Sequence, residues 1–442
     1  MKALVLAVAS MVLAWSQQWD GAQPPTPQGP LQLASAVRTA PTILHVDDDA
    51  EPGGDGSGRR PFNDIADALA LAGSLGDVVV IVAPGTYPVS RTLRIASGVD
   101  LRGSIVMDVD AAGLPTGSIV SGTDTRIVGT EALGSRDLVS VAPDGDGIVE
   151  GVEIRNLTFD SGVGRGTDLS LDRAQGYFVH DNVFTGGHSG NVMFAANGVL
   201  SVASSGRISG NYFSVTVTGA ALAAGYPASP SAVDFVGNRA VHNVGGLVLI
   251  GSTTRVPVTG DQLDVRVQHN DLSENTTAAG FSFGLRIFTI NRPLGAPGDT
   301  QATGNVRATI ADNRIDGNEV GISIDAGFPF RLVGTSTCDP RMYAGTFELD
   351  LRGNTLSGSR FVPSVIAFTR NQAALHQAPL ARWQYLHGAT YEIRDADGTL
   401  ADALIDHPEV DPFIGPCPND ATNEALQNKL IYNGLDLAPT TP

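Results

Sequence analysis

One stretch of the sequence brings together side chains that can perform acid–base chemistry. These side chains are Asp168, Asp172, Arg173, His180, Asp181 and His188. A histidine can donate or accept a proton near neutral pH, and an aspartate can bind calcium or orient a substrate. In this interpretation His180 or His188 is the catalytic acid or base. In the alternative, His180 and Asp181 lie in a solvent-facing turn and Arg173 forms an ion pair with an aspartate.

A second candidate pair, Arg286 and Asp325, lies on short strands that recur along the chain. Their alternating apolar residues align the segments 169–172, 200–203, 247–250, 285–288 and 322–325. This register places Arg286 beside Asp325 on the next strand, as a catalytic pair or as a cross-strand ion pair. A glycoside hydrolase needs two carboxylates about 5–10 Å apart, whereas we expect Asp172 and Asp325 to lie four strand spacings, about 19 Å, apart. The register therefore predicts no carboxylate pair on this face.

An acidic segment formed by Asp47, Asp48, Asp49 and Asp55 precedes these strands. Carboxylate oxygens are ligands that calcium prefers, but the spacing of these four residues matches no standard calcium-binding loop. Calcium is the only cofactor that the sequence suggests.

The candidate residues are embedded in a repeat marked by asparagine. An apolar residue is followed three positions later by Asn, and another apolar or small residue comes two positions after it. The six asparagines are Asn182, Asn211, Asn238, Asn270, Asn313 and Asn354. They are 29, 27, 32, 43 and 41 residues apart, and the two long steps contain insertions at 291–304 and 327–345. A period of this length is typical of a solenoid.

The content of each unit indicates which solenoid this is. The units contain short strands separated by glycine, and about 27 residues of extended chain span about 90 Å, enough for one coil of three short strands. Stacked coils would pair each strand with its equivalent in the next coil and place the six asparagines one above another inside. A buried amide is costly unless it is hydrogen-bonded, and stacked amides can bond one another. The alternative is that the asparagines mark surface turns.

The chain begins with features of an export signal. Lys2 precedes 13 uncharged and mostly apolar residues, 3–15. Ala14 and Ser16 are small residues, as expected at positions −3 and −1 before a cleavage site. We expect residues 1–16 to be a signal peptide, 17–41 to be a Pro-rich linker, and the protein to be secreted, to the periplasm or the cell exterior. An uncleaved anchor or a buried helix is the alternative. No later segment is long and apolar enough to span a membrane.

The composition limits the partners of the chain. It has 28 Lys+Arg against 46 Asp+Glu, so its net charge is −18, which argues against general nucleic-acid binding. With 42% hydrophobic residues it is also too apolar for a disordered chain. We expect a monomer.

Two cysteines, Cys338 and Cys417, are the only ones in the sequence. In an oxidising compartment an even number favours a disulfide, and two buried thiols are the alternative. The bond would tie the inserted loop around Cys338 to a C-terminal cap, which we expect over residues 371–442. Asp397-Gly398 predicts a hairpin turn in this cap.

The N-terminal segment resembles a known family. The matching residues are 55–58, 61–69, 76–78 and 83–87. They are similar to the entry segment of secreted right-handed parallel β-helix proteins of the pectate-lyase-like superfamily. The resemblance implies an all-β, right-handed parallel β-helix in which residues 42–103 form a helical cap and the first coil and residues 104–370 form the further coils.

This resemblance leaves the reaction open, because the superfamily contains lyases, hydrolases, epimerases and non-catalytic adhesins. Arg255-Val256-Pro257 begins a pectate-lyase motif whose second arginine is replaced by Gly260, and Gly187-His188-Ser189 only approximates the Gly-His-Gly of polygalacturonases. Two functions are therefore retained. One is polysaccharide-directed, either glycan binding or lyase or hydrolase action in a groove between the loops at 291–304 and 327–345. The other is a non-catalytic structural or adhesion role at a surface or in a matrix.

Overall fold

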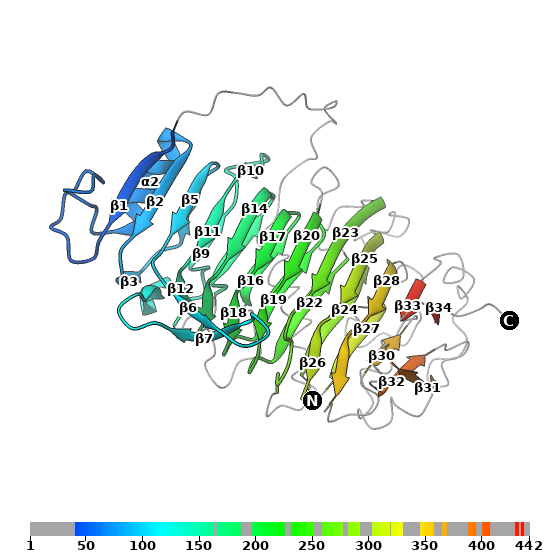
Figure 1. Cartoon of the computed structure of the whole chain (residues 1–442). Coiled ribbons are helices and arrows are strands. Elements are labelled where there is room, and N and C mark those ends of the chain that lie inside the picture. Colours follow the sequence, from blue (N-terminus) through cyan, green and yellow to red (C-terminus); the bar gives the residue numbers. More distant parts are fainter. Residues whose placement is uncertain are drawn as a thin grey trace.

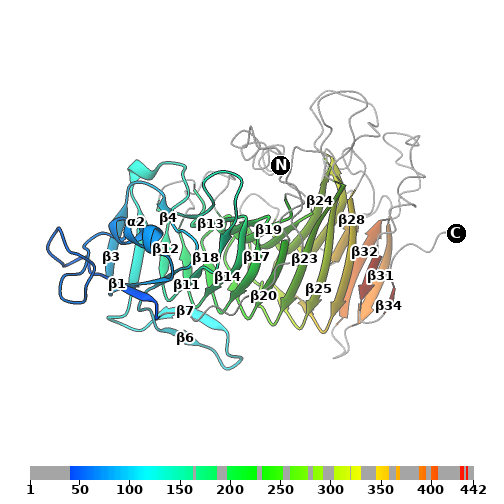
Figure 2. The same ribbon diagram turned by 90° about the horizontal axis from the view of Figure 1, so that it is seen from above.

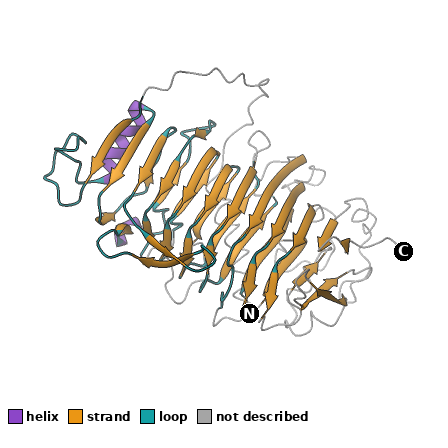
Figure 3. Cartoon of the chain, viewed as in Figure 1, coloured by secondary structure: helices purple, strands orange, loops and turns teal. Residues whose placement is uncertain are grey.

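The computed structural model describes most of the chain between residues 40 and 436. The described ranges are 40–162, 166–186, 197–225, 231–251, 259–276, 282–291, 303–318, 320–329, 345–357, 365–368, 388–394, 400–406, 429–432 and 435–436. They form one elongated stack of coils whose strands run side by side along its length (Figures 1 and 2). Strands dominate, and one α-helix lies at the N-terminal end (Figure 3). Within these ranges no helix is long and apolar enough to cross a membrane.

Three parallel sheets, here called A, B and C, make up the stack. Sheet A consists of β1 (Thr42–Val46), β2 (Val78–Val82), β5 (Val99–Arg102), β11 (Glu153–Arg155), β14 (Ala174–His180), β17 (Ser205–Ser209), β20 (Ser231–Val236), β23 (Thr259–Gln268), β25 (Thr303–Ala311), β28 (Gly345–Arg352), β33 (Lys429–Tyr432) and β34 (Leu435–Asp436), with β10 (Val149–Glu150) beside β14. Sheet B consists of β4 (Leu93–Arg94), β9 (Val139–Val141), β13 (Leu169–Asp172), β16 (Asn197–Val202), β19 (Thr218–Ala223), β22 (Gly245–Ile250), β24 (Phe283–Asn291), β27 (Val320–Pro329), β30 (Val365–Phe368), β32 (Leu400–Asp406) and β31 (Gly388–Arg394).

Sheet C consists of β3 (Gly85–Val89), β8 (Thr125–Gly129), β12 (Thr158–Asp160), β15 (Val183–Thr185), β18 (Tyr212–Ser214) and β21 (Arg239–Ala240). Bridges through Asp271 extend it to β26 (Arg314–Asp316), which pairs with β29 (Thr355–Ser357). A hairpin of β6 (Met107–Val109) and β7 (Pro115–Ile119) leaves the stack between β5 and β8, and a short 3-10 helix, η1 (Glu131–Leu133), follows β8. Each coil thus contributes one strand to each sheet, which is the right-handed parallel β-helix expected above.

The N-terminal end is covered by α2 (Ile65–Leu75). The Asp64 carboxylate accepts a hydrogen bond from the Ala66 N–H and caps the helix, and Gly76 ends it at φ +63°. The predicted face of Ile65, Ala68, Leu69 and Ala72 is buried, and the helix packs against β1, β2 and β4. This contact covers the apolar interior at the β1 end of the described stack.

The predicted asparagine ladder runs through the interior of the stack. None of the six side chains is more than 2% exposed. Each amide from Asn182 to Asn313 donates to the Oδ1 of the next asparagine at 2.8–3.2 Å, and each Oδ1 from Asn211 to Asn354 also accepts from the preceding asparagine's backbone N–H at 2.8–3.1 Å. The surface-turn alternative is therefore wrong.

Two further columns inside the stack were not predicted. Asn243, Asn275 and Asn318 form a second amide ladder, and Asn243 Oδ1 accepts from both the N–H and the hydroxyl of Thr216. Phe159, Phe184 and Phe213 stack with ring centroids 4.9 Å apart. The second ladder lies five residues after the first, a spacing that is visible in the sequence.

The residue before every ladder asparagine has a left-handed backbone, with φ between +54° and +66°. These residues are Asp181, Gly210, Gly237, His269, Asp312 and Gly353. Glycine and, among other residues, Asn, Asp and His tolerate this conformation best. It turns the chain so that the following asparagine points inward.

At the other end the sheets continue past residue 370. β32 pairs with β30 in parallel and β33 pairs with β28 in parallel. β31 and β32 form the antiparallel hairpin that Asp397-Gly398 predicts, with Arg394 opposite Leu400. Cys338 and Cys417 lie outside the described residues, and their disulfide stays a prediction.

Candidate functional site

The outer faces of sheets A and B differ in accessibility. Several outward side chains of sheet B are buried: Leu200 is 7%, Val248 8% and Arg286 5% exposed. Outward side chains of sheet A are half-buried or exposed and mostly polar, as Glu153 and Arg207 illustrate. Since a macromolecular ligand needs accessible polar and aromatic groups, sheet A carries the better candidate site.

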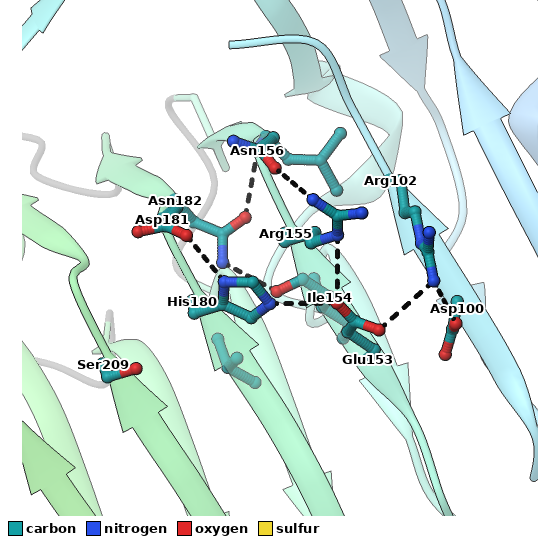
Figure 4. A network of polar contacts seen from close by, with 12 residues as sticks. Asp100, Arg102, Glu153, Ile154, Arg155, Asn156, His180, Asp181, Asn182 and Ser209 are labelled. Atoms are coloured by element: carbon teal, nitrogen blue, oxygen red, sulfur yellow. Dashed lines mark hydrogen bonds and ion pairs between the residues drawn. The ribbon is translucent and has the colours of Figure 1, made fainter. Parts of the chain in front are cut away.

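The site is centred on Glu153, which is on β11 (Figure 4). Its Oε1 lies 3.0 Å from His180 Nε2 and 3.0 Å from Arg155 Nε, and its Oε2 lies 3.4 Å from Arg102 Nη2. The same Arg102 nitrogen lies 2.7 Å from Asp100 Oδ2. Three neighbouring strands, β5, β11 and β14, therefore supply one continuous polar network on the open face.

His180 connects this network to the turn that follows β14. Its Nδ1 lies 2.7 Å from Asp181 Oδ2, and both ring nitrogens therefore face carboxylates. A neutral imidazole has only one N–H, so only the imidazolium can donate to Asp181 and Glu153 together. Protonation of His180 thus decides whether Glu153 has three cationic neighbours or two.

Asp100 lies in register with Glu153, and Arg102 with Arg155, on neighbouring strands. Burial, followed by the neighbouring Glu153 carboxylate, raises the pKa of Asp100, whereas Arg102 opposes this shift. The carboxylates of Asp100 and Glu153 both contact one guanidinium nitrogen at 2.7 and 3.4 Å, so their oxygens lie within roughly 6 Å of each other.

A cluster of Phe178, His180 and Arg207, here called the aromatic station, lies beside the network. The half-buried Phe178 ring stacks on the His180 imidazole with centroids 3.9 Å apart, and the Arg207 guanidinium carbon lies 5.9 Å above the same ring. Arg207 is exposed and has no acidic partner among the described residues. The two rings present an aromatic surface, and the exposed guanidinium adds N–H donors beside it.

The predicted cluster divides between two faces of the stack. His180 lies on the open face, as described. Asp172 lies at the end of β13 on sheet B, where its Oδ2 is 3.3 Å from Arg173 Nε, the ion pair of the alternative interpretation. Burial raises the pKa of Asp172 to about 6, although Arg173 lowers it. His188 lies outside the described residues.

Asp168 is fully buried, and its Oδ1 accepts from the Ser161 N–H at 3.0 Å. Burial raises its pKa well above the ordinary value. Its contacts are with the chain rather than with the open face, so it has a structural role at the start of β13.

The expected register of sheet B is wrong in two places. Leu169 pairs with Val199, so Leu200 points outward and Ser201 inward, and the unpredicted strand β19 follows β16. Ser201 is tolerated inside because its hydroxyl lies 3.0 Å from the Tyr177 hydroxyl. The additional strand places Asp172 five strand spacings, about 24 Å, from Asp325.

Arg286 lies in register with Ser323, and Asp325 with Phe288. Arg286 and Asp325 are therefore offset by two positions rather than directly opposite. Arg286 is buried and its guanidinium carbon lies 5.9 Å from the Phe283 ring centroid. The Asp325 side chain lies outside the described atoms.

The acidic segment brings Asp47, Asp48 and Asp49 together, with one carboxylate oxygen of each within 4.8 Å of the others. Two of these carboxylates accept hydrogen bonds from the backbone: Asp47 from the Asp49 N–H and Asp48 from the Thr86 N–H. These bonds hold the turn before α2 against β3. Calcium binding here stays a prediction.

Sequence reasoning missed Asp100, Arg102, Glu153, Phe178 and Arg207. A usable signal exists for part of this set, because outward residues of sheet A stand two and four positions before each ladder asparagine. His180 and Phe178 precede Asn182 in this way, and Ser209 and Arg207 precede Asn211. Asp100 and Glu153 precede the first ladder asparagine, so no such marker identifies them.

Comparisons with known proteins do not define a function. Residues 48–228 match a family model described as a protein of unknown function, DUF1565. No curated protein matches the sequence.

Similar solved structures include PfbA, a surface adhesin of Streptococcus pneumoniae, at 11% identity and TM-score 0.43, covering 73% of this chain and 81% of that chain. Pectate lyase Pel9A matches at 12% identity and TM-score 0.25, covering 84% and 89% of the two chains. The mannuronan C-5 epimerase AlgE4 A-module of Azotobacter vinelandii matches at 15% identity and TM-score 0.29, covering 73% and 91%. The strand order and register above identify the chain as a parallel β-helix protein.

Proposed function

We propose that this protein is secreted and binds polysaccharide along the outer face of sheet A. The observation that carries the proposal is the half-buried Phe178 ring on the open face, which packs with the His180 imidazole and has the exposed Arg207 guanidinium beside it. A sugar ring has an apolar face, which can stack on an aromatic ring. Its hydroxyl groups can accept hydrogen bonds from guanidinium N–H groups. Parallel coils repeat these outward positions about every 4.8 Å, which suits an extended polymer lying along the stack.

Binding to a panel of soluble polysaccharides tests this proposal, by affinity electrophoresis of the full chain with and without calcium. Phe178→Ala should weaken binding to the retained polysaccharide about tenfold, because it removes the stacking surface. Thr309→Ala is the matched control, since Thr309 occupies the equivalent outward position on β25 but carries no ring; it should weaken binding far less than Phe178→Ala does. Retention that Phe178→Ala leaves unchanged, or no retention by any polysaccharide, contradicts the proposal.

A second candidate function, glycoside hydrolysis, rests on the Asp100 and Glu153 carboxylates. Their separation of at most roughly 6 Å suits a retaining mechanism, in which the two carboxyl groups are about 5–5.5 Å apart. Asp100 has the raised pKa that a proton donor needs, and Glu153 would be the nucleophile. Arg102 lies between them and forms an ion pair with each.

This candidate predicts new reducing ends on a polysaccharide that the chain binds. Asp100→Asn and Glu153→Gln should each lower their rate of appearance by about 10² or more. Asp234→Asn, a carboxylate on the same face in β20, is the control and should leave the rate unchanged. Retained binding without new reducing or unsaturated ends would support the non-catalytic function instead.

A further inference from the structure

The β6–β7 hairpin lies across several coils of sheet C (Figures 1 and 2). In the sequence the hairpin lies between β5 and β8. Its tip nevertheless contacts Arg239, which is on β21. β8 and β21 are four strand spacings apart in sheet C, about 19 Å. Coils of a solenoid ordinarily contact only their neighbours, so this hairpin is an addition to the stack rather than a part of it.

Arg239 attaches the tip of the hairpin. It forms an ion pair with Asp110, donates to the Pro115 carbonyl at 3.1 Å, and donates through Nε to Asp271 Oδ2 at 3.0 Å. The Asp271 side chain is 3% exposed, whereas that of Asp110 is 31% exposed. If the hairpin lifts, Asp110 enters water and Arg239 keeps the buried Asp271 as its partner. Release therefore leaves no buried charge unpaired, which is the main cost of breaking such a pair.

Tyr212 on β18 lies beneath the hairpin. A Cβ atom at Gly117 would lie 2.5 Å from the Tyr212 Cε1, so glycine lets the β7 backbone rest flat on the ring. In and next to the hairpin, Val106, Val109 and Val120 are exposed by 53%, 62% and 43%. The hairpin thus buries few of its own apolar side chains, as is typical of segments that open locally.

We infer that the β6–β7 hairpin is a cover, latched by Asp110 and Arg239, that lifts as a unit from sheet C and exposes Tyr212 and Arg239 while the coils stay folded. The exposed pair would bind a ligand that offers a flat face to the ring and a carboxylate to the guanidinium. The hairpin itself offers these two groups, through Gly117 and Asp110. This site is separate from the face of sheet A, and the inference does not depend on the proposed function.

Nitration of Tyr212 by tetranitromethane, followed by peptide mass spectrometry of the full chain, measures the lifting directly. Asp110→Asn should accelerate nitration about fivefold, because it removes the ionic part of the latch. Gly117→Ala should also accelerate it, by pushing the strand off the ring. Asp108→Asn, an exposed carboxylate on β6 with no ion pair in the described chain, should not.

Amide hydrogen exchange of β15, β18 and β20 in the same variants shows whether the coils stay folded. Unchanged exchange together with faster nitration supports a cover. Unchanged nitration in Asp110→Asn overturns the inference. Nitration that rises together with exchange in all three strands also overturns it, because the hairpin would then be an integral part of the stack.

Discussion

Replacement of one ladder asparagine should measure what the interior amides contribute to stability. Asn238 takes part in four side-chain hydrogen bonds. Its Oδ1 accepts from the Asn211 N–H and amide at 3.0 Å each, and its amide donates to the Ile208 carbonyl at 2.9 Å and to Asn270 Oδ1 at 3.2 Å. Asn238→Leu keeps the number and branching of the side-chain heavy atoms and removes all four bonds, so that no cavity contributes to the loss.

The expected loss is about 5 kcal/mol in the free energy of unfolding, from about 1 kcal/mol for each hydrogen bond and a further cost for the buried Asn211 N–H left without an acceptor. Equilibrium urea unfolding followed by circular dichroism measures it. Gln268→Leu is the control, because it removes a half-exposed amide two residues before Asn270, and it should change stability by about 0.5 kcal/mol or less. A loss below about 1 kcal/mol for Asn238→Leu would refute the argument that the ladder stabilises the stack.

Two further predictions follow from backbone conformation and from burial. Gly210→Ala should destabilise the protein by about 1 kcal/mol more than Gly237→Ala in the same urea assay: both glycines have φ near +65°, but only at Gly210 would the new Cβ approach Asp181 Oδ1, to 2.6 Å. Asp172 has a folded pKa of about 6 against an ordinary 3.8, so its contribution to stability is complete below pH ~4 and is lost as the pH rises through 6. Stability of Asp172→Asn relative to the wild type should therefore rise by up to about 3 kcal/mol between pH 4 and pH 7, and a pH-independent difference would contradict this assignment.

The fold was predictable because its main determinant repeats in the sequence. An amide carries both a donor and an acceptor, so the same residue can occupy one interior position in every coil and bond its own copies. The repeated asparagine is therefore visible in the sequence, and it predicts that the apolar residues around it point inward. Residues 154–159 contain a similar pattern around Asn156, but this asparagine does not join the ladder. Arg155 lies in register with His180, so Leu157 takes the ladder position, where its N–H donates to Asn182 Oδ1.

Sheet B was less predictable because its sequence pattern depends on distant partners. Ser201 is polar and faces inward only because Tyr177, 24 residues earlier in the chain, supplies its hydrogen bond. β19 is built mainly from glycine and alanine, which carry no strand signal of their own. The candidate site was harder still, since β5, β11, β14 and β17 each contribute only one or two of its side chains.

The placement of like charges on the first strands of sheet A argues that this part of the face serves more than stability. Parallel stacking puts equivalent residues of neighbouring strands side by side, and like charges in such positions repel. Farther along the face, Arg207, Asp234 and Arg266 alternate in sign and avoid this cost. Asp100 and Glu153 do not, and the raised pKa of Asp100 records the repulsion together with burial. Departures from a rule that the rest of a fold obeys are expected at functional sites, so the first test of function belongs at these two carboxylates and the aromatic station beside them.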